Sequence, residues 1–219
     1  MISLFHQPWI VVPSCWIDCE TTGTRPGTDR PVQIAIVRFE DCKEVGAFWS
    51  LVNPGMPIPA EATAIHGITD EQVAGAPSVA DVFALPKVRE LLKGAQPAAY
   101  NAPFDRHFVP PFGEDWTWPW LDALSIVRVV DRFVKGKGRH RLELTAQRHG
   151  IPLGKAHDAL DDARAAGSIF YKLAPLHFRK DDPLGHVLRW QRQQEAEEWF
   201  RFMDWRAKQP PIENKEQSL

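Results

Sequence analysis

The sequence of 219 residues lacks any run of about 20 apolar residues, the length that a membrane-spanning helix requires. It also has little net charge, −2 at pH 7, and so lacks the strongly basic surface that binds polyanions without other help. Its first residues show neither the basic region nor the small-residue cleavage site of a secretory signal. These absences predict a cytoplasmic protein that makes no contact with a membrane.

Cysteine is scarce as well. Cys15, Cys19 and Cys42 are the three in the chain, and their spacing is not that of a zinc site, so we expect small buried thiols in a reducing compartment. The composition, 44% hydrophobic and 25% charged, is typical of a globular protein. The length suits one domain of about 150–200 residues with an appendage.

Period-two patterns and turn residues predict strands before helices. The expected strands are Cys15–Glu20, Val32–Glu40, Glu44–Val52 and Ala95–Tyr100, the first starting no earlier than Ser14 because of Pro13. The expected helices are Ser78–Lys93, one near Pro103 capped by Asn101, Asp122–Phe133, Arg141–His149 and Asp158–Leu173. Strands followed by strand–helix alternation predict an α/β fold with a mixed sheet flanked by helices.

A long polar helix over 182–207 follows this region. It carries Trp190, Trp199, Phe200, Phe202, Met203 and Trp205. Its aromatic end is either a partner surface or, as we expect, packed back on its own domain, because large exposed apolar patches are uncommon on monomers. We therefore predict a domain over 1–176 and a helical extension over 177–219 that ends in a flexible tail after Gln209.

Asp18 and Glu20 lie two residues apart in the first predicted strand, so both side chains project from one face, roughly 6–7 Å apart. Two anions on one face repel each other unless a cation lies between them. A solvated outer face is the plainer interpretation of such a pair. The adjoining Thr21-Thr22-Gly23 favours a functional site, since its hydroxyls and flexible backbone suit the binding of phosphate or sugar.

The last helix of the domain carries a second informative acid. A helical projection places Asp162 on one stripe with Ala166 and Ile169, and Asp161 about 100° away, facing water. A carboxylate on an apolar stripe needs a partner, for which a divalent metal or a buried hydrogen bond is available. Asp158 is interpreted as a first-turn acid favoured by the helix dipole.

His157 directly precedes this helix and can point where a helical residue cannot. A histidine beside a metal-binding carboxylate is a candidate general base, because its ordinary pKa of about 6.5 suits proton removal near neutrality.

Asp105 lies in the first turn of a predicted helix and is either a dipole-stabilised or an active-site acid. A basic cluster comprises Arg128, Arg132, Lys135, Lys137, Arg139, His140 and Arg141. It is a solvated loop or a surface that attracts nucleic acid.

Together the patterns Asp18-Cys-Glu-Thr-Thr-Gly23, Asn101-Ala-Pro-Phe-Asp105 and His157-Asp-Ala-Leu-Asp-Asp162-Ala163 resemble the motifs of the DEDDh (DnaQ-like) 3′→5′ exonuclease family. That family includes the epsilon subunit of DNA polymerase III, ribonuclease T and exonuclease X. The resemblance spans about Trp9 to Leu173. Asp158 stands where the tyrosine-bearing sister group has its tyrosine, which favours the histidine subtype.

The resemblance implies a ribonuclease-H-like fold and two Mg²⁺ ions, replaceable by Mn²⁺, held by Asp18, Glu20, Asp105 and Asp162. It implies that His157 deprotonates the attacking water. The substrate would be the 3′ end of single-stranded DNA or RNA, with DNA favoured, and the products nucleoside 5′-monophosphates. The residues expected to contact the substrate are Thr21, Thr22, Gly23, His66, Asn101 and Phe104.

A second hypothesis is a polymerase-associated nucleic-acid-binding module whose C-terminal helix recruits a protein partner or a second copy of the chain. The complete set of five motif residues argues against a loss of catalysis. Proofreading, DNA repair and RNA trimming are all compatible with the sequence, as are several oligomeric states.

Overall fold

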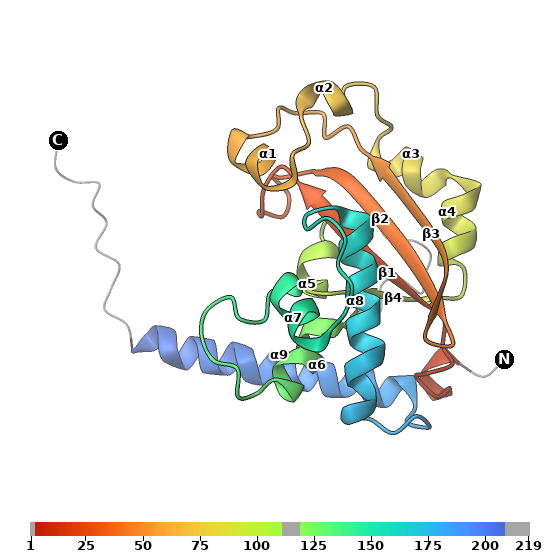
Figure 1. Cartoon of the computed structure of the whole chain (residues 1–219), viewed down its shortest axis with the longest axis vertical. Coiled ribbons are helices and arrows are strands. Elements are labelled where there is room, and N and C mark those ends of the chain that lie inside the picture. Colours follow the sequence, from red (N-terminus) through yellow and green to blue (C-terminus); the bar gives the residue numbers. More distant parts are fainter. Residues whose placement is uncertain (1–2, 111–118, 209–219) are drawn as a thin grey trace.

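A computed structural model describes all residues except 1–2, 111–118 and 209–219, and its centre is a mixed five-stranded sheet (Figure 1). The strands are β1 (Ser14–Thr21), β2 (Pro31–Glu40), β3 (Lys43–Leu51), β4 (Gln96–Ala99) and β5 (Leu121–Asp122), in the order β3-β2-β1-β4-β5. β1, β2 and β3 form an antiparallel meander, whereas β4 and β5 run parallel to β1. The predicted α/β fold with a mixed sheet is confirmed.

Helices cover both faces of this sheet. They are α1 (Ala60–His66), α2 (Asp70–Val73), α3 (Val79–Ala84), α4 (Pro86–Leu92), α5 (Ala102–Asp105), α6 (Ala123–Val130), α7 (Leu142–His149), α8 (Ala159–Leu173) and α9 (Leu184–Ala207). Two short 3₁₀ turns, η1 (Leu4–His6) and η3 (Ala174–Leu176), complete the described elements. Figure 1 shows α8 lying across the sheet, with α3 and α4 on the side of β3.

Strand alternation separates the two larger of three described hydrophobic clusters, one on each face of the sheet, and the third lies by α1 and α2. In β1, Trp16 packs into the core that contains α6, α8 and the start of α9. Cys15, Ile17 and Cys19 point to the opposite face, into the core that contains α3 and α4. The predicted buried thiols at Cys15 and Cys19 are therefore confirmed. Even-numbered positions of β1, which include Asp18 and Glu20, share the face that α8 covers.

Small side chains let α8 approach the sheet closely. Ala159, Ala163 and Ala166 line its inner face. At Gly167 the approach is closest, because a Cβ atom there would lie 2.6 Å from Cε2 of Phe39. The packing of α8 against the side chains of Phe39 and Trp16 at this point therefore requires glycine.

The single helix predicted over Ser78–Lys93 was wrong. The structure has two helices there, α3 and α4, separated at Leu85, whose φ of −60° and ψ of 132° are extended rather than helical. Pro86 explains the break. Its ring disfavours the helical conformation in the preceding residue, and it has no N–H to continue the helix.

The first half of α9 belongs to the main core, with Leu184, Val187 and Leu188 buried. The expectation that the aromatic end packs back on the domain was wrong, because Trp199 and Trp205 are 59% and 55% exposed. Figure 1 shows this end extending past the other helices. A helix of 24 residues is about 36 Å long, and the buried residues of α9 extend no further than Gln191. The rings instead contact one another along the helix.

Two further expectations concern the chain ends and membranes. The flexible tail predicted after Gln209 lies outside the described residues. Within 3–110 and 119–208, no helix has the length and hydropathy needed to cross a bilayer.

We predict that Gly167→Ala destabilises the fold by roughly 1–3 kcal/mol, since the added methyl group overpacks the contact with Phe39. Urea unfolding of the variant and the parent measures the difference. Gly75→Ala is the control, because a Cβ atom there meets nothing within 4 Å. Equal stability of the two variants would contradict the close approach of α8.

Candidate active site

The acids of the first motif project from the end of β1 beneath α8. Asp18 pairs with Ala35 of β2, and Glu20 pairs with Gln33, just before the register shifts at Thr21. Oε1 of Gln33 accepts a hydrogen bond from the N–H of Ala159, 3.2 Å away, at the first residue of α8. Gln33 thereby ties the start of this helix to the strand that neighbours Glu20.

Asp105 is the last residue of α5, the helix that follows β4, and its side chain lies beside the same end of β1. Its Oδ1 accepts a hydrogen bond of 3.1 Å from the backbone N–H of Cys19, between Asp18 and Glu20. Asn101 stands at the N-cap position of α5, as predicted, but its side chain makes no capping hydrogen bond. It lines the same cavity as the acids instead.

Asp162 faces inward from α8, as the helical projection predicted, and its Oδ1 is buried without a hydrogen-bond partner among the described residues. Asp161 is only half-buried and accepts the N–H of Lys155. Asp158 is the N-cap of α8, and its side chain accepts hydrogen bonds from the N–H groups of Leu160 and Asp161. This capping role explains an acidic residue at this position without any part in the site.

His157 has a φ of +60°, in the left-handed region that residues other than glycine rarely adopt. Such a conformation costs of order 1–2 kcal/mol. It turns the imidazole towards the acids, so that ligand atoms of His157, Glu20 and Asp162 lie within 4.8 Å of one another. Nε2 of His157 also lies 3.5 Å from Oε1 of Glu143, on α7.

These side chains line one cavity of about 530 Å³. Of the residues predicted to act in catalysis or substrate binding, its walls include Asp18, Glu20, Asn101, Phe104, Asp105, His157 and Asp162. Arg128, His140 and Arg141 of the predicted basic cluster line it too. Segments from across the chain therefore converge on a single pocket whose lining contains both a group of acids and a group of basic residues.

Four of the predicted substrate-binding residues lie outside the walls of this cavity. Thr21 donates its hydroxyl to the Gly23 carbonyl, and Thr22 bonds Asp29 and Arg30, so both threonines shape the turn after β1. A Cβ atom on Gly23 would lie 2.6 Å from Asp29, which explains the glycine. His66 is buried and accepts the N–H of Ile68 through Nδ1. Substrate contact by these four residues stays a prediction.

Tyr100 and Glu143 also line the cavity and were missed at the level of sequence. Tyr100 donates its hydroxyl to the carbonyl of His140, 2.7 Å away. Glu143 lies near His157 only through the packing of α7 against α8. Neither belongs to a local pattern, so only the tertiary fold reveals them.

Crowding of acids governs the electrostatics of the pocket. Burial raises the pKa of Asp18 well above its ordinary value, and the charges of Asp105 and Asp162 raise it further. Burial raises the pKa of Asp162 to about 7, and the charge of Glu20 adds to the rise. Ionised together, these carboxylates require a nearby cation.

A divalent metal ion fits this set of ligands. The oxygen donors of Asp18, Glu20, Asp105 and Asp162 suit a hard cation, and the unpartnered Oδ1 of Asp162 offers a free lone pair. Among the described residues, the group of candidate ligands whose atoms lie within 4.8 Å of one another is Glu20, His157 and Asp162, without Asp18 or Asp105. The imidazole of His157 therefore lies close enough either to bind an ion or to act beside one.

Between the two acids of β1, Cys19 points the other way. Its thiol lies in the core beneath α3 and α4, and burial raises its pKa well above the ordinary value. Only its backbone contributes to the pocket, through the N–H that Asp105 accepts.

Comparison with known proteins gives matches to an exonuclease family model and to DNA polymerase III proteins. The RNase T family model, described as exonuclease, matches residues 15–170. A "DNA polymerase III subunit epsilon-like protein" of Rhodobacter capsulatus is 40% identical over 167 residues, 72% of this chain and 23% of that protein. "DNA polymerase III PolC-type" of Thermotoga petrophila is 28% identical, over 73% of this chain and 12% of that protein. The chain thus spans less than a quarter of the length of these curated relatives.

Solved structures show the same fold. "Exonuclease X in complex with 5′ overhanging duplex DNA" superposes with a TM-score of 0.64 and 24% identity, covering 80% of this chain and 98% of that one. "E. coli Exonuclease I in complex with a dT13 oligonucleotide" gives 0.60 and 22%, covering 75% of this chain and 42% of that one. Both likenesses bear out the predicted ribonuclease-H-like architecture.

We predict that saturating Mg²⁺ or Mn²⁺ raises the melting temperature by roughly 5–10 °C, because an ion binds the folded acid cluster and not the unfolded chain. Asp162→Asn should lose most of this shift and melt higher than the parent in chelator, since it removes one of the mutually repelling charges. Calorimetry with and without the ion measures both effects.

Asp161→Asn is the matched control for that experiment. An amide oxygen at this position still accepts the Lys155 N–H, so the ion-dependent shift should persist. A similar loss in both variants would refute the assignment of Asp162 to the inner face.

A further prediction concerns Asp122, the buried N-cap of α6, whose pKa burial raises from 3.8 to about 7. Between these values the folded state keeps a proton that the unfolded state releases, so stability falls as pH rises, by up to about 1.4 kcal/mol per unit. Asp122→Asn should make that slope shallower by the contribution of this one group, while its amide oxygen still caps Leu124 and the other buried acids, such as Asp162, keep their share. Urea unfolding from pH 5 to pH 8 tests this, with the exposed Glu71→Gln as control. Identical pH dependence in parent and Asp122→Asn would contradict it.

Proposed function

The chain belongs to the RNase T exonuclease family, and we propose that it is a metal-dependent 3′→5′ exonuclease that acts on single-stranded nucleic acid. The observation that carries this proposal is the convergence of Asp18, Glu20, Asp105, His157 and Asp162 on one cavity. These residues come from β1, α5, the segment before α8 and α8 itself. A merely structural set of acids would have no reason to gather around a cavity and leave the buried Oδ1 of Asp162 without a hydrogen-bond partner among the described residues.

Asp18, Glu20 and Asp162 are the residues that would hold a pair of divalent ions, with Asp105 in support. When bound, such a pair of ions supplies the charge that stabilises the attacking and leaving oxygens of an in-line displacement. The backbone N–H of Cys19 holds the carboxylate of Asp105 in position by a hydrogen bond. Mg²⁺ is the proposed ion and Mn²⁺ its substitute.

His157 is the proposed general base. In this role it takes a proton from a water molecule whose oxygen bonds to the terminal phosphorus, while the bond to the 3′ oxygen of the preceding nucleotide breaks. The released product is a nucleoside 5′-monophosphate. Glu143, 3.5 Å from Nε2, is placed to orient the imidazole and to stabilise its protonated form.

The cavity walls offer contacts for a terminal nucleotide. Phe104 and Tyr100 are aromatic groups on which a base can stack, and Asn101 offers hydrogen bonds at the same rim. Arg128 and Arg141 supply positive charge for phosphates. Two of the structural neighbours are described as complexes with DNA, one with a dT13 oligonucleotide and one with a 5′ overhanging duplex, and this supports DNA as the favoured substrate.

A role as a partner-recruiting module is the second candidate, favoured by the exposed aromatic residues of α9 and by the polymerase subunits named among the relatives. Recruitment of a partner does not by itself explain why the acids gather around a cavity. A direct assay of nuclease activity therefore separates the two candidate functions.

The decisive assay is digestion of 5′-labelled DNA and RNA oligonucleotides of matched sequence, with Mg²⁺, with Mn²⁺ and with chelator. We expect a ladder that shortens from the 3′ end, together with nucleoside 5′-monophosphates, only when the ion is present. Cuts at internal bonds, or no release from any oligonucleotide, would refute the proposed exonuclease.

For His157→Ala we predict a kcat lower by about 10²–10⁴-fold with an unchanged Mn²⁺ affinity, because a general base is lost and a ligand is not. Single-turnover kinetics and calorimetric titration with Mn²⁺ measure the two quantities. His186→Ala, an exposed histidine on α9 outside the cavity, is the control. A large drop in Mn²⁺ affinity would make the imidazole a metal ligand instead of the base.

A further inference from the structure

A second cleft of about 560 Å³ adjoins the proposed active site. It lies between α6, the loop after it and the outer half of α9. Its charged lining comprises Arg128, Arg132, Lys135 and Arg201 against a single acid, Glu198, with His140 between them. In a chain with a net charge of −2, this is a marked local excess of positive charge.

The two cavities are continuous in their walls. Arg128 and His140 line both the pocket that contains the acids and the second cleft. The loop between α6 and α7 runs along this shared boundary, with Gly138 on the side of the acids and Gly136 on the side of the cleft. A strand whose last nucleotide occupies the pocket can therefore continue past Arg128 into the cleft.

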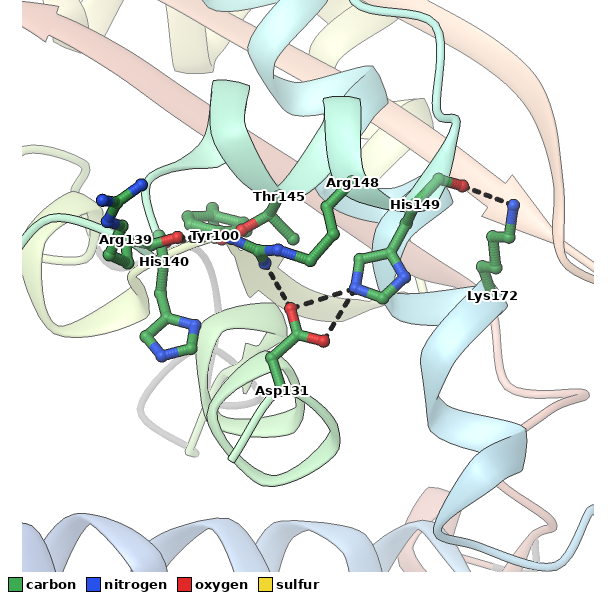
Figure 2. Close-up of polar contacts among 8 residues, drawn as sticks. All are labelled: Tyr100, Asp131, Arg139, His140, Thr145, Arg148, His149 and Lys172. Carbon is green, nitrogen blue, oxygen red and sulfur yellow. Dashed lines mark hydrogen bonds and ion pairs between the residues drawn. The ribbon is translucent and has the colours of Figure 1, made fainter. Parts of the chain in front are cut away.

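The loop at this boundary is anchored at consecutive backbone positions (Figure 2). Arg148 donates through Nη2 to the carbonyl of Arg139, 2.6 Å away, and the Tyr100 hydroxyl donates to the carbonyl of His140. Arg148 in turn forms an ion pair with Asp131, which also contacts Nε2 of His149 at 3.0 Å. This network joins the end of α6 to α7 and holds His140 where the two cavities meet.

α9 contributes one whole side of the cleft through Gln194, Glu198 and Arg201. Arg128 forms an ion pair with Glu198, so the basic wall of α6 is held against this helix by an acid. A carboxylate paired with an arginine occupies the place that a phosphate would take, because the guanidinium binds both groups in the same geometry.

From these observations we propose that the cleft between α6 and α9 binds the phosphodiester backbone of the strand on the 5′ side of the nucleotide held in the pocket. Arg201 and Lys135 contact successive phosphates, and Arg128 exchanges Glu198 for a phosphate. The inference rests on the proposed exonuclease function. It assigns the C-terminal helix α9 a role in substrate binding that the sequence pattern of this helix does not predict.

Binding measurements test the cleft apart from catalysis. Fluorescence anisotropy with a labelled thymidine dodecamer, a uridine dodecamer and a thymidine trinucleotide is recorded in Ca²⁺, with strand integrity checked on gels. Arg201→Gln should weaken dodecamer binding about 3–10-fold and reduce the slope of log affinity against log salt by about 0.7, the loss of one phosphate contact on a single strand. The trinucleotide, which places fewer phosphates in the cleft, should lose clearly less affinity than the dodecamer.

Two companion variants sharpen the result. Arg206→Gln removes the same charge from the same helix outside the cleft and should leave the dodecamer affinity unchanged. Glu198→Gln should tighten dodecamer binding, because Arg128 loses its competitor. Equal weakening by Arg201→Gln and Arg206→Gln, equal effects on the long and short strands, or weaker binding by Glu198→Gln would each overturn the proposal.

The outcomes also separate this proposal from the exonuclease function. If the dodecamer binds with the expected dependence on length and on Arg201, but no mononucleotide is released in Mg²⁺, the binding role of the cleft is supported and the exonuclease activity is refuted. If mononucleotides are released and Arg201→Gln binds both strands like the parent, the cleft fails and the exonuclease stands.

Discussion

Repulsion among buried carboxylates is the constraint on which the rest of the site depends. Asp18, Glu20, Asp105 and Asp162 gather in one pocket, and burial together with their mutual charge raises the pKa values of Asp18 and Asp162. A fold keeps such an arrangement only if other contacts hold the acids in place, because by itself the cluster opposes folding. The large hydrophobic cores on both faces of the sheet provide that excess stability.

The positions of the acids depend on a few close backbone contacts. Gly167 lets α8 approach the sheet, Gln33 ties the first turn of α8 to β2, and the Cys19 N–H holds Asp105. His157 takes a left-handed conformation so that its ring turns towards the pocket. Each contact fixes one element relative to β1 or β2, so the geometry of the site comes from packing around the sheet more than from contacts among the acids themselves.

Much of this arrangement was predictable because it rests on local periodicity. Alternation along β1 gave the shared face of Asp18 and Glu20, and the helical stripe gave the inward direction of Asp162. Pro86 should have ended the helix predicted over Ser78–Lys93, since its effect on Leu85 is also local. The nearness of Glu143 to His157 and the exposure of Trp199 were not predictable, because they depend on where separate helices end and meet.

The alternation of β1 has one more consequence, for the chemistry of sulfur. Cys19 stands directly between two of the acids in sequence, yet its thiol is buried on the far side of the sheet, with a pKa raised well above its ordinary value. Nucleophilic sulfur chemistry requires an accessible thiolate, so alkylating reagents and peroxide find no reactive group there. Burial on the far face of the sheet thus lowers the reactivity of a thiol that sequence proximity would mark as an oxidative weakness.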